Sequence, residues 1–354
     1  MQDSIKVKSC IRYLLIAIGL TILFAVDAII AAKQDNPITA LRKIDDFPLY
    51  CLNYSGDYSF DKFLRHGAKD IQELNRFLLT NKLITRELQG GQDGTCSCFT
   101  ATSQSGEVLF GRNYDLPGKP PVLLLYTHPS NGYASISMVN LNTLKNSTSK
   151  KDTDNNIVAN LPAAPYFPAD GMNEPGVAVA ILSVPAASFQ PIPMNVSILR
   201  WQVTRLILDY ARNVDEAIAL ISKYNVNVKA FGTFIHYLVA DASGNSAVIE
   251  FVAGKMRVIR GEKSWQIVTN FILYNNYGDA GRKRYVRLNR ILTANHGLLS
   301  EIEAMNLLRS VSLDTTVWSA VYNLRNKEVC LSLGRQYAQK KKFSVKTITS
   351  STRN

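Results

Sequence analysis

The chain has 354 residues, 46% hydrophobic and 19% charged, which is an ordinary globular composition. Its cysteines are too few for a disulfide scaffold. They are Cys10, Cys51, Cys96, Cys98 and Cys330. The formal net charge is +12, and eleven of these charges fall in residues 96–354. Because the lysines there are scattered, we expect no nucleic-acid partner. The excess of positive charge favours a solvated basic surface, or a preference for anionic membranes or acidic substrates.

The N-terminal segment has a basic start, an apolar run over residues 13–32 and a small-residue end before Lys33. This run is long enough to span a bilayer, but the same pattern is that of a secretory signal peptide. Asp27 would be costly near a bilayer centre, which favours a cleaved signal over a permanent anchor. With residues 1–32 as signal peptide or membrane anchor, we expect an exported protein, periplasmic or extracellular.

Residues 33–95 are predicted to be a pro-segment or a retained small subunit. A short strand is followed by a helical pattern over residues 63–78, whose apolar side chains share one face. The stretch QGGQDG, residues 89–94, then brings three glycines directly before Thr95 and Cys96. Such a flexible break is accessible to cleavage of the chain.

From Cys96 onward, strand patterns dominate. Short apolar runs bounded by turn residues predict several hairpins, and helical periodicity appears between them. The expected hairpins cover residues 96–115, 234–251 and 316–334, and the expected helices lie within residues 196–224, 284–295 and 299–312. Asp215 is the expected cap of the second helix in the 196–224 segment. This order predicts an α+β protein, a four-layer α-β-β-α sandwich of two antiparallel sheets.

The stretch GTCSCFTATSQSGEVLFGRNYD, residues 94–115, raises the question of what Cys96 and Cys98 do. The CxC spacing is not that of a zinc ribbon or a CxxC redox pair, so we expect no metal and no cofactor. A catalytic thiol needs a base and oxyanion donors. The sequence leaves open whether one of the four histidines approaches Cys96, and His236, in the middle of a strand, is expected to be structural.

The alternative base is the chain's own α-amino group, which titrates near neutral pH. It lies beside the Cys96 thiol only if the Thr95–Cys96 bond is cut. Arg112 would then hold the thiolate and substrate charge, and Asp115 would orient the new ammonium. The competing interpretation makes the two cysteines ordinary strand residues and Arg112–Asp115 a surface ion pair.

These features resemble the N-terminal-nucleophile cysteine amidohydrolases of the choloylglycine hydrolase and penicillin V acylase family, the linear amide C–N hydrolases. Acid ceramidase and the isopenicillin N acyltransferases are more distant relatives. Members begin the mature chain with Cys and carry a G-R-x-x-D-like motif, with the Arg sixteen and the Asp nineteen residues later. Arg112 and Asp115 have this spacing from Cys96 and not from Cys98.

The resemblance covers about residues 90–345. DGMNEPGVAVAIL is similar to the family's turn and strand, which implies that the backbone N–H at Ser183 is an oxyanion donor. IVTN implies the same role for the Asn270 side chain, and RKRYVRL makes Arg284 the active-site arginine. Only fourteen residues separate Asn270 from Arg284, so the long tetramer-forming insertion of the bile-salt and penicillin enzymes is expected to be missing, and substrate specificity is not carried over.

The resemblance therefore implies an N-terminal nucleophile hydrolase fold, with residues 96–354 as an amidohydrolase domain. The expected reaction cleaves a small N-acyl amide through a thioester on Cys96, after the chain has exposed this residue by cutting itself. Two alternatives stay open: an acyltransferase that passes the acyl group to an amine, and a non-catalytic envelope binding protein of the same fold. Membrane association, a homo-oligomer and a retained N-terminal fragment also stay open.

Overall fold

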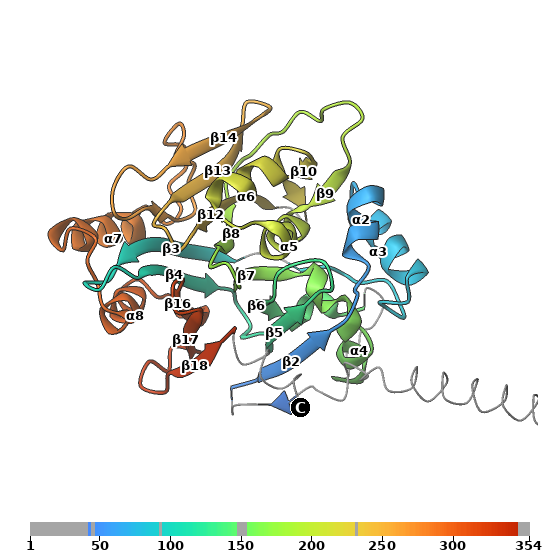
Figure 1. The fold of residues 1–354 in the computed structure, drawn as a ribbon, viewed down its shortest axis with the longest axis horizontal. Helices are drawn as coiled ribbons and strands as arrows, with labels where there is room; N and C mark the ends of the chain where they lie inside the picture. Colours follow the sequence, from blue (N-terminus) through green and yellow to red (C-terminus); the bar gives the residue numbers. More distant parts are fainter. Residues whose placement is uncertain (1–41, 44–46, 92–93, 147–153, 231–232, 346–354) are drawn as a thin grey trace, which may run out of the picture.

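The structure is a computed structural model that describes residues 42–43, 47–91, 94–146, 154–230 and 233–345 (Figure 1). The expected signal peptide or membrane anchor over residues 1–32 lies outside these residues. In the part of the chain that is described, no helix combines the length and apolar character needed to cross a membrane.

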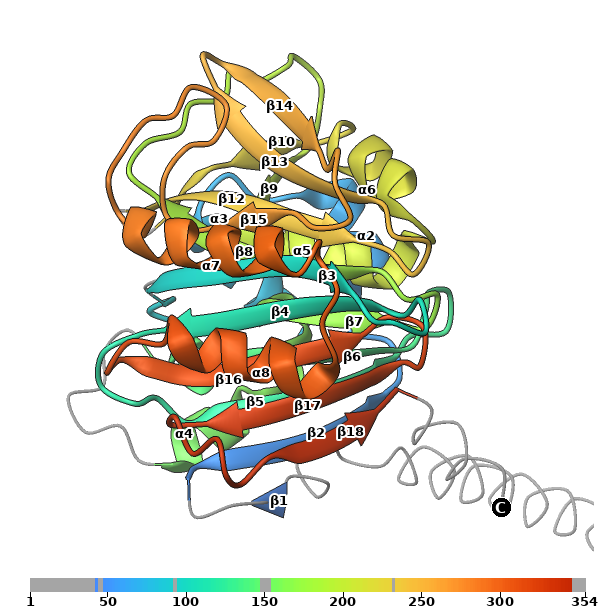
Figure 2. The same cartoon turned by 90° about the vertical axis from the view of Figure 1, so that its left-hand side faces the viewer.

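Two β-sheets stack face to face at the centre of the described chain (Figure 2). The larger sheet has the strand order β1-β2-β5-β6-β7-β8-β12-β13-β14, and β11 pairs with β12. Neighbouring strands are antiparallel except for β2 and β5, which are parallel. Its strands are β1 (Arg42–Lys43), β2 (Leu49–Ser55), β5 (Val122–His128), β6 (Ser135–Asn140), β7 (Pro168–Asn173), β8 (Ala178–Val184), β11 (Lys229–Ala230), β12 (Thr233–Ala240), β13 (Ser246–Val252) and β14 (Lys255–Arg260).

The smaller sheet contains the predicted nucleophile and has the strand order β15-β3-β4-β16-β17-β18. The hairpins predicted over residues 96–115 and 316–334 are confirmed as β3–β4 and β16–β17. Its strands are β3 (Thr95–Thr102), β4 (Val108–Asp115), β15 (Ile267–Val268), β16 (Thr316–Asn323), β17 (Glu328–Leu333) and β18 (Lys341–Ser344). A short parallel pair, β9 (Ser197–Leu199) and β10 (Asn225–Asn227), stands apart from both sheets.

Helices cover the outer face of each sheet (Figures 1 and 2). The helices α7 and α8 lie over the smaller sheet, while α5 and α6 pack on β7, β8 and β12 of the larger one. The helices are α2 (Phe60–His66), α3 (Ile71–Thr80), α4 (Asp154–Ala159), α5 (Arg200–Tyr210), α6 (Val214–Ile221), α7 (Arg282–Ala294) and α8 (Glu301–Ser310), with 3₁₀ turns η2 (Leu141–Leu144) and η3 (Leu161–Tyr166). The predicted α+β class and four-layer α-β-β-α order are confirmed.

Buried apolar side chains form three clusters that follow these layers. One lies between the larger sheet and its helices and includes Phe63. A second fills the space between the sheets and includes Cys96 and Cys98, and a third joins Phe99 of β3 to Leu288 of α7. Because successive side chains of a strand point to opposite faces, β3 contributes alternately to the second and third clusters.

Two local predictions differ from the structure. The helical pattern over residues 63–78 is two helices, because Gly67 adopts a φ of 75° that ends α2, and Asp70 then caps α3. The prediction that Asp215 caps the second helix of its pair is wrong. Asn213 accepts the capping hydrogen bond, and Asp215 lies in the first turn of α6, where a negative charge suits the helix dipole.

Candidate active site

The two cysteines of the CxC stretch occupy the start of β3, on the face that looks into the space between the sheets. Cys96 pairs with Tyr114 of β4, and Cys98 pairs with Arg112. Cys96 is 1% exposed, whereas Thr95, directly before it, is exposed. At the predicted cleavage site, one exposed residue, Thr95, therefore stands between the buried Gly94 and the buried Cys96.

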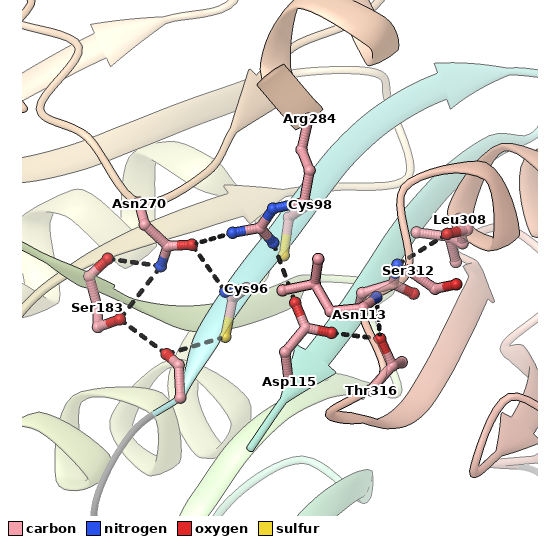
Figure 3. A network of polar contacts seen from close by, with 12 residues as sticks. Cys96, Cys98, Asn113, Asp115, Ser183, Asn270, Arg284, Leu308, Ser312 and Thr316 are labelled. Carbon is pink, nitrogen blue, oxygen red and sulfur yellow. Dashed lines mark hydrogen bonds and ion pairs between the residues drawn. The ribbon is translucent and has the colours of Figure 1, made fainter. Parts of the chain in front are cut away.

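Asn270 joins Cys96 to the end of β8 (Figure 3). Its Oδ1 accepts a hydrogen bond from the backbone N–H of Cys96 at 2.8 Å. Its Nδ2 donates to the carbonyl and to the hydroxyl of Ser183, at 2.7 and 3.1 Å. The structure thus brings Asn270 and Ser183, the two residues that the IVTN and DGMNEPGVAVAIL motifs pointed to, together at Cys96, while their oxyanion roles stay predictions.

Arg284, at the start of α7, binds two members of the site at once (Figure 3). Its Nη2 donates to Asn270 Oδ1 at 2.6 Å, and its Nη1 forms an ion pair with Asp115 at 3.0 Å. Thr316 donates to the other oxygen of Asp115 at 2.6 Å. Burial raises the pKa of Asp115, although Thr316 and Arg284 act in the opposite direction.

Arg112 is fully buried and lies close enough to Cys96 for their charges to interact, but its hydrogen bonds go to other residues. Its Nε donates to Asp170 of β7 at 3.2 Å, and its Nη1 lies 3.6 Å from the sulfur of Cys98. Trp318 and Tyr322 donate to the same carboxylate, at 3.0 and 2.5 Å. The competing interpretation of Arg112–Asp115 as a surface ion pair is therefore wrong, because the two side chains are buried and have different partners.

Cys98 has the environment of an inert thiol. It is fully buried, and this burial raises its pKa to about 12 despite the neighbouring Arg112. A thiol with such a pKa is almost entirely protonated at neutral pH and is a poor nucleophile. This environment argues against Cys98 as the nucleophile, while the choice of Cys96 from the Cys–Arg–Asp spacing stays a prediction.

Gly94 places the end of the predicted pro-segment or small subunit, residues 33–95, in the site, and we call this segment the leader. Its carbonyl accepts a hydrogen bond from the Ser183 hydroxyl at 2.7 Å and lies 3.7 Å from the sulfur of Cys96. A Cβ on Gly94 would lie 1.5 Å from the carbonyl oxygen of Asp115. Only glycine fits this approach of the leader to the end of β4.

The histidines do not offer a base for the buried thiol. His66, His128 and His296 are exposed, whereas Cys96 is buried. The ring nitrogens of His236 face Glu250 at 2.9 Å and the carbonyl of Thr269 at 2.8 Å. The prediction of a structural His236 is confirmed. The described residues contain no group of three or more His, Cys, Asp or Glu placed to hold a metal ion.

Sequence reasoning missed three residues that the structure places in or beside the site. Asp170 is the first residue of the DGMNEPG motif, but only its ion pair with Arg112 in the structure shows that it lies beside the site. Gly94 ends the glycine-rich break, which the sequence marks only as flexible and accessible to cleavage. Thr316 comes from a strand some two hundred residues away from Asp115, and nothing in the sequence marks it.

Comparison with known proteins adds a family. The family model of the linear amide C–N hydrolases, choloylglycine hydrolase family, matches residues 96–289, more than half of the chain. This chain belongs to the choloylglycine hydrolase family. The members of this family are amidohydrolase enzymes, and the region of this chain that matches begins at Cys96.

Among family relatives, the penicillin V acylase of Pectobacterium atrosepticum is 32% identical over 114 residues. This alignment covers 28% of the chain and 29% of that relative, so it spans less than a third of the relative's length. Two crystal structures of conjugated bile acid hydrolase variants from Clostridium perfringens match with TM-scores of 0.52 and 0.50 and 16% and 15% identity. Each match covers 71% of this chain and 93% of the other, and supports the N-terminal nucleophile hydrolase fold.

Proposed function

We propose that this protein hydrolyses linear amide C–N bonds through Cys96, after the chain has cut its own Thr95–Cys96 bond. The observation that carries the proposal is the hydrogen bond from the Cys96 backbone N–H to Asn270 Oδ1, at 2.8 Å. It holds the nitrogen that would become the terminal amine. Arg284 extends the same network to Asp115, so a new ammonium group would form beside two acceptors able to orient it, Asn270 Oδ1 and the Asp115 carboxylate.

Self-cleavage would begin with attack of the Cys96 sulfur on the carbonyl carbon of Thr95. The acyl group passes from nitrogen to sulfur, and water then hydrolyses the thioester to leave a carboxylate on Thr95 and an amine on Cys96. Once the bond is cut, movement of the freed end of the leader would take the Gly94 carbonyl away from the Ser183 hydroxyl and from the Cys96 sulfur, while the rest of the leader stays packed on the fold. The uncut chain would therefore be a zymogen whose leader fills its own site.

Amide hydrolysis would reuse the thiol with the new amine as its base. The amine accepts the thiol proton, the thiolate attacks the substrate carbonyl, and the proton passes to the leaving amine. The Asn270 side chain and the Ser183 backbone N–H would stabilise the oxyanion. Water, activated by the same amine, then releases the acyl group from Cys96 as a carboxylic acid.

The substrate would be a small N-acyl amide. The names of the relatives direct a screen to penicillin V and conjugated bile acids, and N-acyl amino acids and N-acyl lipids extend it. Export of the protein, to the periplasm or outside the cell, with residues 13–32 as a membrane anchor if they are not removed, is part of the same proposal.

The first experiment is the intact mass and N-terminal residue of the purified protein, followed by the substrate screen. We expect a chain that begins at Cys96 and releases carboxylic acid from at least one linear amide. The variant Cys96→Ala is the control and stays joined at Thr95. A wild-type chain that is still joined there, with no turnover, would contradict the proposal.

A further inference from the structure

A buried histidine and a buried glutamate that the proposed chemistry does not use lie beside the loop that carries Asn270. His236 of β12 and Glu250 of β13 are 0% and 1% exposed. Tyr237 pairs with Ile249 in the sheet, so the residue before the first and the residue after the second are cross-strand neighbours. The Nδ1 atom of His236 lies 2.9 Å from Oε1 of Glu250. Because Glu is almost never fully buried without a partner, this pair is a built feature of the core.

The loop between β15 and α7 is attached to the pair on both sides of Asn270. On one side, the His236 Nε2 lies 2.8 Å from the carbonyl oxygen of Thr269, the residue directly before Asn270. On the other side, the Glu250 carboxylate accepts hydrogen bonds from both backbone N–H groups of the segment 273–274, each at 2.9 Å. The backbone that carries the Asn270 side chain is therefore tied to two neighbouring strands of the larger sheet.

Arg257 of β14 continues the same row of side chains. It is the cross-strand partner of Glu250, and its guanidinium carbon lies 4.8 Å from the centre of the Tyr274 ring in the loop. A cation over an aromatic ring is attracted by its electrons. Directly opposite residues of neighbouring strands share one face of a sheet, so three strands present three side chains to one loop. We call His236, Glu250 and Arg257 the cross-strand row.

The partners of His236 require a proton on each of its ring nitrogens. The carbonyl of Thr269 can only accept, so Nε2 must donate. Burial alone would raise the pKa of Glu250, but hydrogen bonds from His236 and the loop backbone outweigh this and lower that pKa below 4.5. Its carboxylate is thus ionised at neutral pH and also only accepts, so Nδ1 must donate as well.

We propose that the cross-strand row positions Asn270 for the proposed reaction, with His236 as an imidazolium that donates to Thr269 and Glu250 at once. Charge-assisted hydrogen bonds fix the backbone on both sides of Asn270, and its side chain then meets the backbone N–H of Cys96 at 2.8 Å. The three residues are positioning residues, because they act on the chemistry through the Asn270 backbone. This inference rests on the proposed function, because it assigns further residues to the same site.

The positioning is tested on uncut Cys96→Ala protein, apart from turnover. The backbone N–H of residue 96 donates to Asn270, so its hydrogen exchange, followed by NMR, reports how firmly Asn270 is held. We expect His236→Gln to speed this exchange about tenfold, because a glutamine has both donors on one nitrogen and cannot replace two ring N–H groups. The amide of Leu324, which donates to the Val108 carbonyl, is the internal reference. Equal acceleration at both amides would mean general destabilisation and would overturn the inference.

Two further variants complete this measurement. His128→Gln is the matched control, because it removes an exposed histidine from the end of β5 and should change neither amide. Arg257→Gln lies on the edge strand β14 and serves if His236→Gln does not fold. It removes the cation from the Tyr274 ring and should speed exchange at residue 96 about threefold. No change there would contradict the role of the row.

The protonation of His236 is tested by NMR on the same uncut protein with ¹⁵N-labelled histidine. We expect one histidine to carry protons on both ring nitrogens at pH 7, protected from exchange because the ring is buried. This signal should be missing from His236→Gln and present in His128→Gln. A His236 ring with one bare nitrogen would overturn the imidazolium.

Turnover in an otherwise wild-type chain decides the proposed function separately. On an amide that the wild type hydrolyses, His236→Gln should lower kcat about tenfold and leave KM within about twofold, because Asn270 is proposed to act in the transition state. Adding Glu250→Gln should lower kcat little further, since the two residues act as one unit.

The two proposals fail in different ways. If the wild type hydrolyses amides and His236→Gln keeps its kcat, the amidase proposal stands and the positioning inference fails. If no amide is hydrolysed while exchange at residue 96 still responds to His236→Gln, the positioning of Asn270 stands and the proposed function fails for these amides.

Discussion

Two thiols that are two residues apart in β3 have different chemistry because of what surrounds each one. Cys98 lies against Arg112 inside the space between the sheets, where burial raises its pKa to about 12. Cys96 lies at the end of the strand, where its backbone N–H reaches Asn270 and the exposed Thr95 precedes it. At the scale of single residues, position along the strand separates a structural thiol from a proposed nucleophile.

Replacing Cys98 by alanine should leave self-cleavage and most of the turnover intact. The loss of one buried sulfur should lower the free energy of unfolding by about 1 kcal/mol. Mass spectrometry of the purified variant and its kcat test this, with Cys96→Ala as the inactive reference. If Cys98→Ala is as inactive as Cys96→Ala, the choice of Cys96 over Cys98 as the nucleophile is contradicted.

Replacing Asn270 by alanine should lower kcat about 10²–10³-fold in a folded protein, because one proposed oxyanion donor is lost. The same change removes the acceptor of the Cys96 backbone N–H, so self-cleavage should also slow. Kinetics on any amide that the wild type hydrolyses, with near-ultraviolet circular dichroism as the folding control, test this. A kcat within about threefold of the wild type would refute the role.

At the scale of secondary-structure elements, the geometry of the site depends on the ends of strands β3 and β4 and on the loop between β15 and α7. The leader enters β3 through Gly94, next to the last residue of β4. The loop between β15 and α7 is held by Glu250 of β13, which accepts hydrogen bonds from the backbone N–H groups of Leu273 and Tyr274, both at 2.9 Å. Asn270 lies in this loop and Arg284 in the first turn of the helix that follows it, so the attachment of the loop helps to position both.

Gly94→Ala should slow self-cleavage strongly. The added Cβ would collide with the carbonyl of Asp115, so the leader must move away from Ser183 and Cys96. Gly118→Ala is the control: nothing lies within 4 Å of the added Cβ there, although its φ of 87° strains the backbone. The cleaved fraction at fixed times after synthesis measures the effect, and equal fractions in the two variants would contradict the steric argument.

The stabilising effect of Glu250 should depend on pH. Burial alone would raise its pKa, but hydrogen bonds from His236 and the loop backbone outweigh this and lower the pKa below 4.5. A lowered folded-state pKa gives stability that is full above pH 4.5 and is lost as the pH falls through the folded pKa. Glu250→Gln should therefore cost about 2 kcal/mol at pH 7 and progressively less below pH 4.5. Urea unfolding of both proteins from pH 3 to 7 measures this. If the difference in their free energy of unfolding does not change with pH, the ionised Glu250 carboxylate is excluded as its source.

At the scale of the whole molecule, the segment before the proposed cleavage site is part of the fold. Strand β2 pairs in parallel with β5 along its full length, and α2 and α3 pack in the largest buried cluster. Leu52, Phe63, Leu74 and Leu78 are fully buried there. Each such side chain contributes about 1.5–3 kcal/mol of apolar burial, so removal of the segment would expose a large apolar surface.

After cleavage, the fragment that ends at Thr95 should stay bound to the chain that begins at Cys96. Size-exclusion chromatography under native conditions should give one peak that contains both polypeptides, and guanidinium should separate them. The uncut Cys96→Ala protein provides the reference elution volume. A fragment that elutes alone would make residues 33–95 a discarded pro-segment.

The sequence by itself predicted the fold class and the strand-rich region from Cys96. Its resemblance to the family added the choice of Cys96, by the spacing of Arg112 and Asp115, and the roles of Asn270 and Arg284, which stay predictions. These signals are local, since alternation, turn residues and motif spacing act over a few residues along the chain. Only the tertiary structure decided which groups pair. Arg112 binds Asp170 of another sheet, Asp115 binds Arg284 of α7 and Thr316 of β16, and His236 and Glu250 of the larger sheet hold the loop that carries Asn270. Such contacts join residues far apart in sequence, and burial and charge become properties of a site only when the layers close around it.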